Sequence, residues 1–270
     1  LFRSAMTVGA LILVQVGLAF SKLKSLGNKP LLGSLGLLVL VCIQGAFGAW
    51  TVTLKLQPII VTTHLMLALV LLACLTAYAQ QAWEEKFSAV RAIRIRPLSA
   101  QLVLLAFMVL FIQVFLGAWV STNYAVLACP DFPTCMGAWY PKMDWHNAFY
   151  LWRELGQAKS GEVIPMTALV TIHWTHRVGA IVASAVLLFL AITALRRANP
   201  SIAFWGKAII ALLALQIVTG VSNVVFQWPL LAALLHTGGA AAILFCLIRL
   251  SAWSDCSFFS GKQNDRLEAS

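Results

Sequence analysis

The sequence predicts an all-α fold, a polytopic transmembrane helical bundle, on two observations. First, 61% of the 270 residues are hydrophobic and only 10% are charged, whereas soluble domains carry about 25% charged residues. The mean hydropathy is +0.87. Second, apolar runs of roughly 20 residues recur along the chain, each long enough to cross a hydrocarbon core about 30 Å thick. None of these runs has the features of a cleavable signal peptide, so the chain is expected to form one membrane bundle.

Seven apolar runs predict seven spans, separated by connections in which most charged residues collect. The predicted spans cover residues 4–20, 31–50, 59–79, 101–120, 167–195, 208–226 and 229–250. No Asp or Glu falls within any of them. This argues against a proton-coupled transporter, in which intramembrane acids are expected.

The formal net charge of +10 is explained by short basic connections rather than by a nucleic-acid-binding surface. When alternate connections are assigned to alternate sides, one side carries most of the cations, and the positive-inside rule makes that side cytoplasmic. The cytoplasmic side carries Lys22, Lys24, Lys29, Lys86, Arg91, Arg94, Arg96, Arg196, Arg197, Lys207, Arg249, Lys262 and Arg266. The outer side carries Arg3, Lys55, Lys142, Arg153 and Lys159. The N-terminus is therefore predicted outside and the C-terminus inside.

The longest connection, about 121–166, faces outward in this topology. It contains Cys129 and Cys135, and outside the cytoplasm such a pair can persist as a disulfide. The pair is interpreted as a bridge that closes the loop, with a redox relay as the alternative. Residues 144–155 are predicted to form a short interfacial helix, or else an ordinary aromatic belt. Three further cysteines lie in spans, where they are expected to pack as small apolar residues, and one lies in the tail: Cys42, Cys74, Cys246 and Cys256.

One segment of the sequence occurs twice. Residues 44–64 read QGAFGAWTVTLKLQPIIVTTH, and residues 216–236 read QIVTGVSNVVFQWPLLAALLH. Each begins with Gln, has Gly four residues later and ends with His twenty residues after the Gln. Gln113 and Gly117 repeat the beginning of the pattern.

Both segments cross the membrane in the same direction, which predicts a parallel duplication of four-helix units. Residues 1–100 would form an N-terminal half that lacks its opening helix, and residues 101–250 a complete C-terminal half. Residues 251–270 would form a cytoplasmic tail. The duplication also leads to the expectation that the chain is truncated at its N-terminus.

Four of the five histidines lie in or beside predicted spans, just after an outward connection: His64, His173, His176 and His236. At 1.5 Å per residue they would lie roughly 10 Å below the outer interface. Histidines at one depth on three helices predict a functional site, since imidazole in hydrocarbon is costly unless bonded. Hydrogen bonding between helices is the alternative. Imidazole is a common axial ligand of heme iron, so the histidines are predicted to hold heme.

Other residues refine this interpretation. The three glutamines of the repeat bond either heme edges or neighbouring helices, and helix packing is favoured. Arg177 could pair with a heme propionate through its guanidinium, or extend to the interface as a membrane-flanking cation. His173 lies three residues before His176, on a neighbouring face of the helix, and has no assigned role. His146 is expected on the surface of the outer connection. The chain lacks Cys-x-x-Cys-His, so covalent heme attachment is not expected.

Four motifs in the sequence resemble those of a known protein family. The runs QGAFGAWTVTLKLQPIIVTTHL, GAWVSTNYAVLACPDFPTCMGAW, IHWTHRVGA and LLHTGGAA resemble heme A synthase of the proteobacterial type, in order and with compatible spacing. The resemblance covers residues 30–250. It implies an eight-helix protein of two four-helix halves, of which seven spans are visible here. Such oxidoreductases convert heme O to heme A for cytochrome oxidase assembly, by oxidising a ring methyl to a formyl group.

The resemblance also implies roles for particular residues. His176 and His236 would ligate the iron of a heme b cofactor, with Arg177 beside them, and His64 would be an axial ligand of the substrate heme. The family's partner for His64 is a histidine before an arginine, and here Phe2 and Arg3 stand at that position. The family's glutamate position falls before residue 1. Residues 1–270 alone are therefore not expected to complete the reaction.

The resemblance implies a location in the bacterial inner membrane, with lipid and heme O as partners. Heme O synthase, an electron acceptor and a second copy of the chain are further expected partners, and nucleic acid is not. The alternative function is a non-catalytic membrane electron carrier of the cytochrome b type. A heme or small-molecule transporter is a third interpretation, suggested only by the parallel repeat.

Overall fold

The computed structural model describes residues 2–87 and 98–254. In these ranges the chain is helical, with only isolated β-bridges and no strands. The helices are α1 (Phe2–Ser21), α2 (Leu23–Leu26), α3 (Asn28–Thr53), α4 (Pro58–Phe87), α5 (Ala100–Thr122), the 3₁₀ helix η2 (Ala125–Leu127), α6 (Trp145–Ala148), α7 (Met166–Leu195), α8 (Pro200–Val225) and α9 (Leu230–Ser251).

Six of the described helices are long and apolar enough to cross a membrane, namely α3, α4, α5, α7, α8 and α9. The prediction of an all-α, polytopic membrane bundle is therefore confirmed. The first predicted span, 4–20, is also helical, but the apolar part of α1, Ala5–Ser21, is shorter than the other six.

Two predicted helices begin or end at different residues in the structure. Helix α8 begins at Pro200, not near residue 208, because the Asn199 side chain accepts hydrogen bonds from the first backbone N–H groups and Pro suits the first helical position. The predicted span began after Lys207 because that cation was counted with the cytoplasmic connection. The helix predicted at 144–155 is only Trp145–Ala148 long, and the residues that follow form turns and irregular structure.

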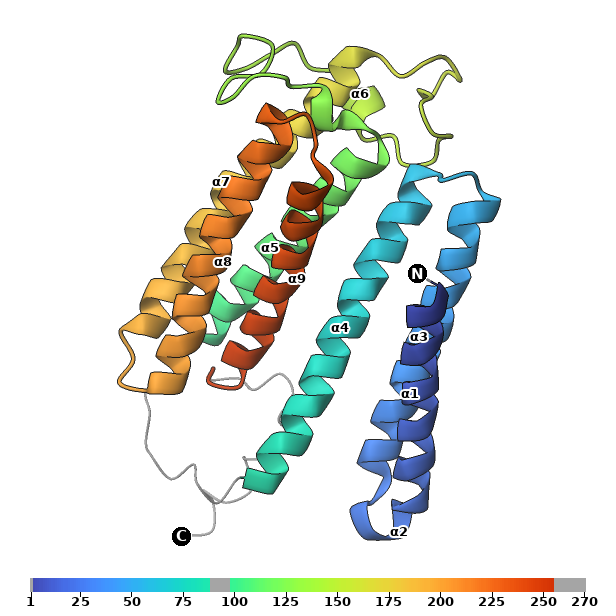
Figure 1. The fold of residues 1–270 in the computed structure, drawn as a ribbon, viewed down its shortest axis with the longest axis vertical. Helices are drawn as coiled ribbons and strands as arrows, with labels where there is room; N and C mark the ends of the chain where they lie inside the picture. The colour runs from blue at the N-terminus through green and yellow to red at the C-terminus, as the bar shows by residue number, and fades with distance from the viewer. Residues whose placement is uncertain (1, 88–97, 255–270) are drawn as a thin grey trace.

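Four helices, α5, α7, α8 and α9, form a closed ring in which each packs against two neighbours (Figure 1). The largest buried apolar cluster is centred on this ring and includes Leu190, Ile209 and Leu247. Helix α4 packs against α5 and α9, α3 against α4, and α1 against α3. We call the end of the bundle that carries residues 123–165 the loop end, and it lies at the top of Figure 1.

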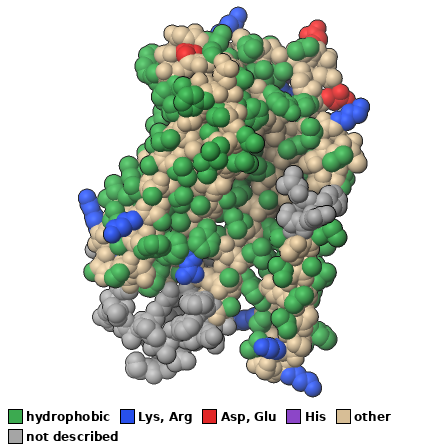
Figure 2. All heavy atoms as spheres, viewed as in Figure 1, with side chains coloured by type: hydrophobic (Ala, Val, Ile, Leu, Met, Phe, Trp, Pro, Cys, Tyr) green, Lys and Arg blue, Asp and Glu red, His purple; other side chains and the backbone are tan. Residues whose placement is uncertain are grey.

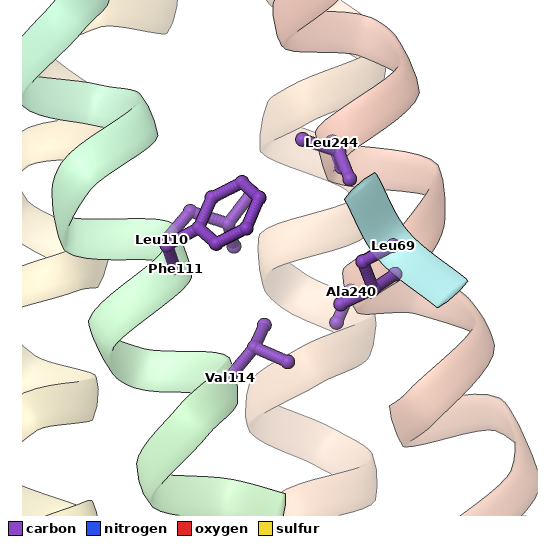
Figure 3. A pocket seen from close by; sticks show the side chains of 6 residues that line it. All are labelled: Leu69, Leu110, Phe111, Val114, Ala240 and Leu244. Atoms are coloured by element: carbon purple, nitrogen blue, oxygen red, sulfur yellow. The ribbon is translucent and has the colours of Figure 1, made fainter. Parts of the chain in front are cut away.

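The contact between α4 and the ring contains a small pocket with an entirely apolar lining (Figure 3). Its side chains are Leu69, Leu110, Phe111, Val114, Ala240 and Leu244. All six lining side chains are apolar, so α4 packs against the ring through apolar contacts here.

The side chains on the visible face of the molecule are arranged as a membrane protein requires (Figure 2). Hydrophobic side chains cover most of the surface between the two ends, and Asp and Glu appear only near the loop end. Lys and Arg appear at both ends.

The connections α3–α4 and α8–α9 have the same backbone turn. Each contains two consecutive non-glycine residues with positive φ, Lys55 and Leu56 in one and Gln227 and Trp228 in the other. Their hydrogen bonds also correspond: the Leu56 N–H donates to the Thr51 carbonyl, and the Trp228 N–H to the Asn223 carbonyl. The sequence repeat therefore extends to the backbone conformation of the turn.

Helices α7 and α8 approach closely at Gly206. A Cβ at this position would lie 2.8 Å from the Ala191 carbonyl oxygen and 3.1 Å from the Ala194 Cβ. We expect Gly206→Ala to destabilise the protein by about 1–3 kcal/mol, because overpacking forces two helix backbones apart. Thermal unfolding in detergent would measure this. Gly36→Ala is the matched control, since a Cβ there meets nothing within 4 Å, and equal unfolding temperatures for the two variants would contradict the prediction.

Candidate functional site

The candidate site is built from three contacts between a glycine and a histidine ring on a neighbouring helix. A Cβ added at Gly48 would lie 3.1 Å from Cε1 of His64, one at Gly117 would lie 2.9 Å from Cε1 of His176, and one at Gly220 would lie 3.3 Å from Cε1 of His236. Each glycine lies five residues before the loop end of its helix, α3, α5 or α8. The three glycines therefore make room for three imidazole rings at one depth.

The structure brings two of these histidines together inside the four-helix ring. The ring centroids of His176 and His236 are 6.4 Å apart, with the ring planes at 78°. An imidazole nitrogen lies about 2 Å from a bound transition metal, so two imidazoles on opposite sides of one iron have centroids about 6 Å apart. The observed separation fits a bis-histidine heme iron.

A hydrogen bond to one ring nitrogen holds His236 in an orientation suited to a ligand. The Thr219 hydroxyl donates to the Leu215 carbonyl at 2.7 Å, so its oxygen is available to accept from Nδ1–H of His236, 3.0 Å away. That tautomer leaves the lone pair on Nε2, the atom that ligates a metal in such arrangements. Sequence reasoning missed Thr219, although its place three residues after Gln216 puts it on the same face of α8.

The surroundings of His176 are similar but not identical. Gln113 Nε2 lies 3.0 Å from His176 Nδ1 and donates to the His176 carbonyl at 3.1 Å. Ligation through Nε2 would require a proton on Nδ1 and an acceptor for it. The Oε1 atom of Gln113 is buried without a hydrogen-bond partner among the described residues, and turning the amide would present it to Nδ1. The donor set therefore fits heme iron after one side-chain rotation.

His64 lies apart from the ring pair, on α4. Gln44 Nε2 is 3.5 Å from its Nε2, and its Nδ1 is buried without a partner among the described residues. The position predicted for a second ligand, at Phe2 and Arg3, has side chains outside the part of the chain that the structure describes.

Arg177 holds the outer loop against α7. Its Nη1 donates to the carbonyls of Asp131 and Thr134, and its Nη2 to the carbonyl of Cys129, all at 2.8 Å. Its Nε lies 3.3 Å from Nε2 of His173. These four contacts leave one guanidinium N–H for another acceptor such as a propionate. His173 is buried and, in this structure, contacts the arginine.

The loop that Arg177 holds is closed by a disulfide between Cys129 and Cys135, as predicted. Both cysteines are buried. Within the loop, Asp131 accepts hydrogen bonds from the Thr134 hydroxyl and from two backbone amides, those of Met136 and Gly137, and these bonds lower the pKa of its carboxyl. The loop is therefore a compact unit placed over the His176 end of the site.

We expect the two loop cysteines to resist a membrane-impermeant maleimide until the protein is reduced. The reason is that a disulfide has no thiol to alkylate, and both sulfurs are buried. The measurement is mass-resolved labelling before and after treatment with a reductant. Cys129→Ser/Cys135→Ser is the control, and label on these two cysteines before reduction would contradict the bridge.

The other predicted residues lie away from the ring pair. His146 is exposed on α6, as expected. Cys246 is buried in α9, but Cys42 and Cys74 are exposed on the bundle surface, so their assignment as packing residues was wrong. Cys256 lies outside the described residues.

A second buried arginine was also missed. The guanidinium of Arg153 donates to the Asn147 carbonyl and to Oδ1 of Asn123, and lies 5.6 Å from the centroid of the Trp119 ring. Burial lowers the pKa of this arginine. Its place in an outer connection predicted only a surface cation, because the fold of the loop brings its partners together from distant positions.

Comparisons with known proteins agree with this arrangement. A family model described as COX15-CtaA, cytochrome oxidase assembly protein, matches residues 3–248. A heme A synthase of Shewanella oneidensis is 36% identical over 217 residues, which are 80% of this chain and 64% of that protein. A heme A synthase of Methylobacterium radiotolerans is 31% identical over 216 residues, covering 79% and 56%. One of Paracoccus denitrificans is 27% identical over 231 residues, covering 81% and 55%. The chain thus spans between about half and two thirds of the length of these relatives.

Proposed function

The chain belongs to the COX15-CtaA family of cytochrome oxidase assembly proteins, and from that membership we propose that it is a heme A synthase. The proposed reaction oxidises a ring methyl of heme O to the formyl group of heme A. The observation that carries the proposal is the His176–His236 pair, whose ring centroids are 6.4 Å apart inside the four-helix ring. This separation and these donors suit heme iron held between two imidazoles.

We propose that the cofactor held by this pair is heme b, which would supply one-electron transfer when bound. His176 and His236 would be its axial ligands, and Thr219 would fix the Nδ1–H tautomer of His236. Arg177 has one guanidinium N–H left for a propionate after its four described contacts. The apolar side chains below the histidines would keep water from the heme.

His64 is proposed as an axial ligand of the substrate heme, since it has the same relation to Gly48 as the ring histidines have to their glycines. We further propose that the chain consists of two related halves, 1–100 and 101–250, followed by a tail, 251–270. The shared turn of the α3–α4 and α8–α9 connections supports this division. So does the packing, because α1 and α4 flank α3 as α7 and α9 flank α8.

The loop end is proposed to face outward from a bacterial inner membrane, with the N-terminus of this chain outside and the C-terminus inside. The basic connections at the opposite end and the disulfide at the loop end support this orientation. Heme O synthase as the source of substrate, an external electron acceptor and a second copy of the chain are proposed partners.

The test is to express residues 1–270 in a host that makes heme O, purify the protein and identify its hemes by acid extraction and absorption spectroscopy. Heme A together with heme B would support the synthase and would show that residues 1–270 complete the reaction alone, against the expectation from the sequence. Heme B without heme A would contradict synthesis by this chain and favour the electron carrier. Absence of any heme would contradict the His176–His236 site as well.

A further inference from the structure

The ring histidines have a second kind of support, at their main-chain carbonyls. Gln216 Nε2 on α8 donates to the His236 carbonyl on α9 at 2.8 Å, and Gln113 Nε2 on α5 donates to the His176 carbonyl on α7 at 3.1 Å. Within a helix a carbonyl already accepts one bond from the residue four positions on, and it has a second lone pair. Each glutamine uses that second lone pair, so each histidine is tied by its backbone to the neighbouring helix.

These two bonds depend on glycines placed three residues after each histidine. A Cβ added at Gly239 would lie 2.3 Å from Nε2 of Gln216, and one at Gly179 would lie 2.5 Å from Oε1 of Gln113. Both distances are too short for any side chain to coexist with the glutamine in its present position. The glycines therefore make the space through which the glutamines reach the carbonyls.

The corresponding position after His64 is Leu67. Here Gln44 makes no bond to the histidine carbonyl among the described residues. Its Nε2 lies instead 3.5 Å from Nε2 of His64, the ring atom that would ligate iron, and its Oε1 is buried without a partner. The same Gln–Gly–His pattern thus gives a bond to the histidine carbonyl where Gly follows, and only a contact with the ring where Leu follows.

We propose that the residue three positions after His64 and after His236, Leu67 in one case and Gly239 in the other, determines whether a heme site exchanges or retains its heme. Gln216 and Gly239 are positioning residues that fix the axial ligand His236 of a retained heme. Leu67 leaves Gln44 against the ligating atom of His64, so a heme binds there only by displacing the amide and leaves more readily. This rests on the proposed heme sites but does not require synthase activity.

The first experiment measures the rate at which the purified, heme-loaded protein transfers heme B to excess apomyoglobin. Gly239→Ala and Gln216→Leu are each expected to raise that rate by roughly tenfold, the effect of losing about one hydrogen bond at a ligand. Gly238→Ala is the matched control, because a Cβ there meets nothing within 4 Å, and it is expected to behave as the native protein.

The double variant separates positioning from general destabilisation. Since Gly239→Ala already displaces Gln216, adding Gln216→Leu is expected to raise the rate no further, whereas independent effects would multiply. The low-spin electron paramagnetic resonance spectrum should shift equally in both single variants. The reason is that each variant removes the bond to the His236 backbone, so the His236 imidazole can rotate. Multiplying effects, or equal rates for Gly239→Ala and Gly238→Ala, would overturn the proposal for the ring site.

The reciprocal experiment uses a His176→Ala/His236→Ala background, in which the ring site has lost both ligands and the heme that copurifies is the one at His64. Leu67→Gly is expected to raise the amount of heme retained, while Leu67→Ala, which keeps a Cβ, is not. Equal retention would overturn the exchange half of the proposal. Failure of the proposed function looks different: a protein that retains heme B but forms no heme A still allows the transfer experiment, and a protein that binds no heme B contradicts the site itself.

Discussion

Replacing His236 by alanine is expected to abolish the low-spin bis-histidine heme signal of the purified protein. The two ring centroids are 6.4 Å apart, so each imidazole would occupy one axial side of the same iron. Removal of one leaves a single ligand, which changes the spin state and weakens retention. Optical and electron paramagnetic resonance spectra of protein purified with heme would measure both effects. His176→Ala should give the same loss.

His146→Ala is the control for this prediction, because that histidine is exposed on α6, away from the ring pair. It should leave the spectrum unchanged. His64→Ala should also retain the low-spin signal of the ring site while losing any heme bound on α4. An unaltered low-spin spectrum in His236→Ala would refute the ligand assignment.

Arg177→Met is expected to destabilise the protein without heme by about 3 kcal/mol or more. The substitution removes three charge-assisted hydrogen bonds and leaves the carbonyls of Cys129, Asp131 and Thr134 without that donor. The disulfide would still close the loop, but the loop would no longer be tied to α7. Thermal unfolding in detergent and limited proteolysis of residues 123–165 would measure the two consequences.

This experiment also separates the two roles considered for Arg177. Support of the loop predicts an effect in heme-free protein, whereas pairing with a propionate predicts an effect only when heme is bound. Arg177→Lys is the informative companion, because a single ammonium cannot reproduce the spread of the guanidinium over three carbonyls. Native stability of heme-free Arg177→Met would exclude the loop role.

The sequence alone was sufficient for the bundle and for the positions that repeat. Apolar length predicted the spans, and the fixed spacing of Gln, Gly and His predicted which residues share a depth. These features depend on local periodicity, which the linear order of residues records directly. His236 was found by this spacing, whereas His176 was singled out because it follows an outer connection closely, and the pairing of the two was implied by the family resemblance.

The contacts made by the outer loop could not be predicted in the same way. Arg177 meets carbonyls more than forty positions earlier in the chain, and Arg153 meets Asn123 through the fold of the same connection. Backbone carbonyls carry no side-chain signature, so no pattern in the sequence marks them as acceptors. The beginning of α8 was missed for a different reason: the predicted span was started after Lys207, although the helix itself begins at Pro200, where Asn199 caps it.

The paired positive-φ residues of the α3–α4 and α8–α9 connections have a consequence for protein engineering. Glycine and histidine lie on either side of the turn, sixteen residues apart in both hairpins. One residue added to the following helix before the histidine would rotate its ring by about 100° around the helix axis, away from the glycine. Replacement loops at these two connections should therefore keep the number of residues between glycine and histidine, and should supply residues that tolerate positive φ at the two turn positions.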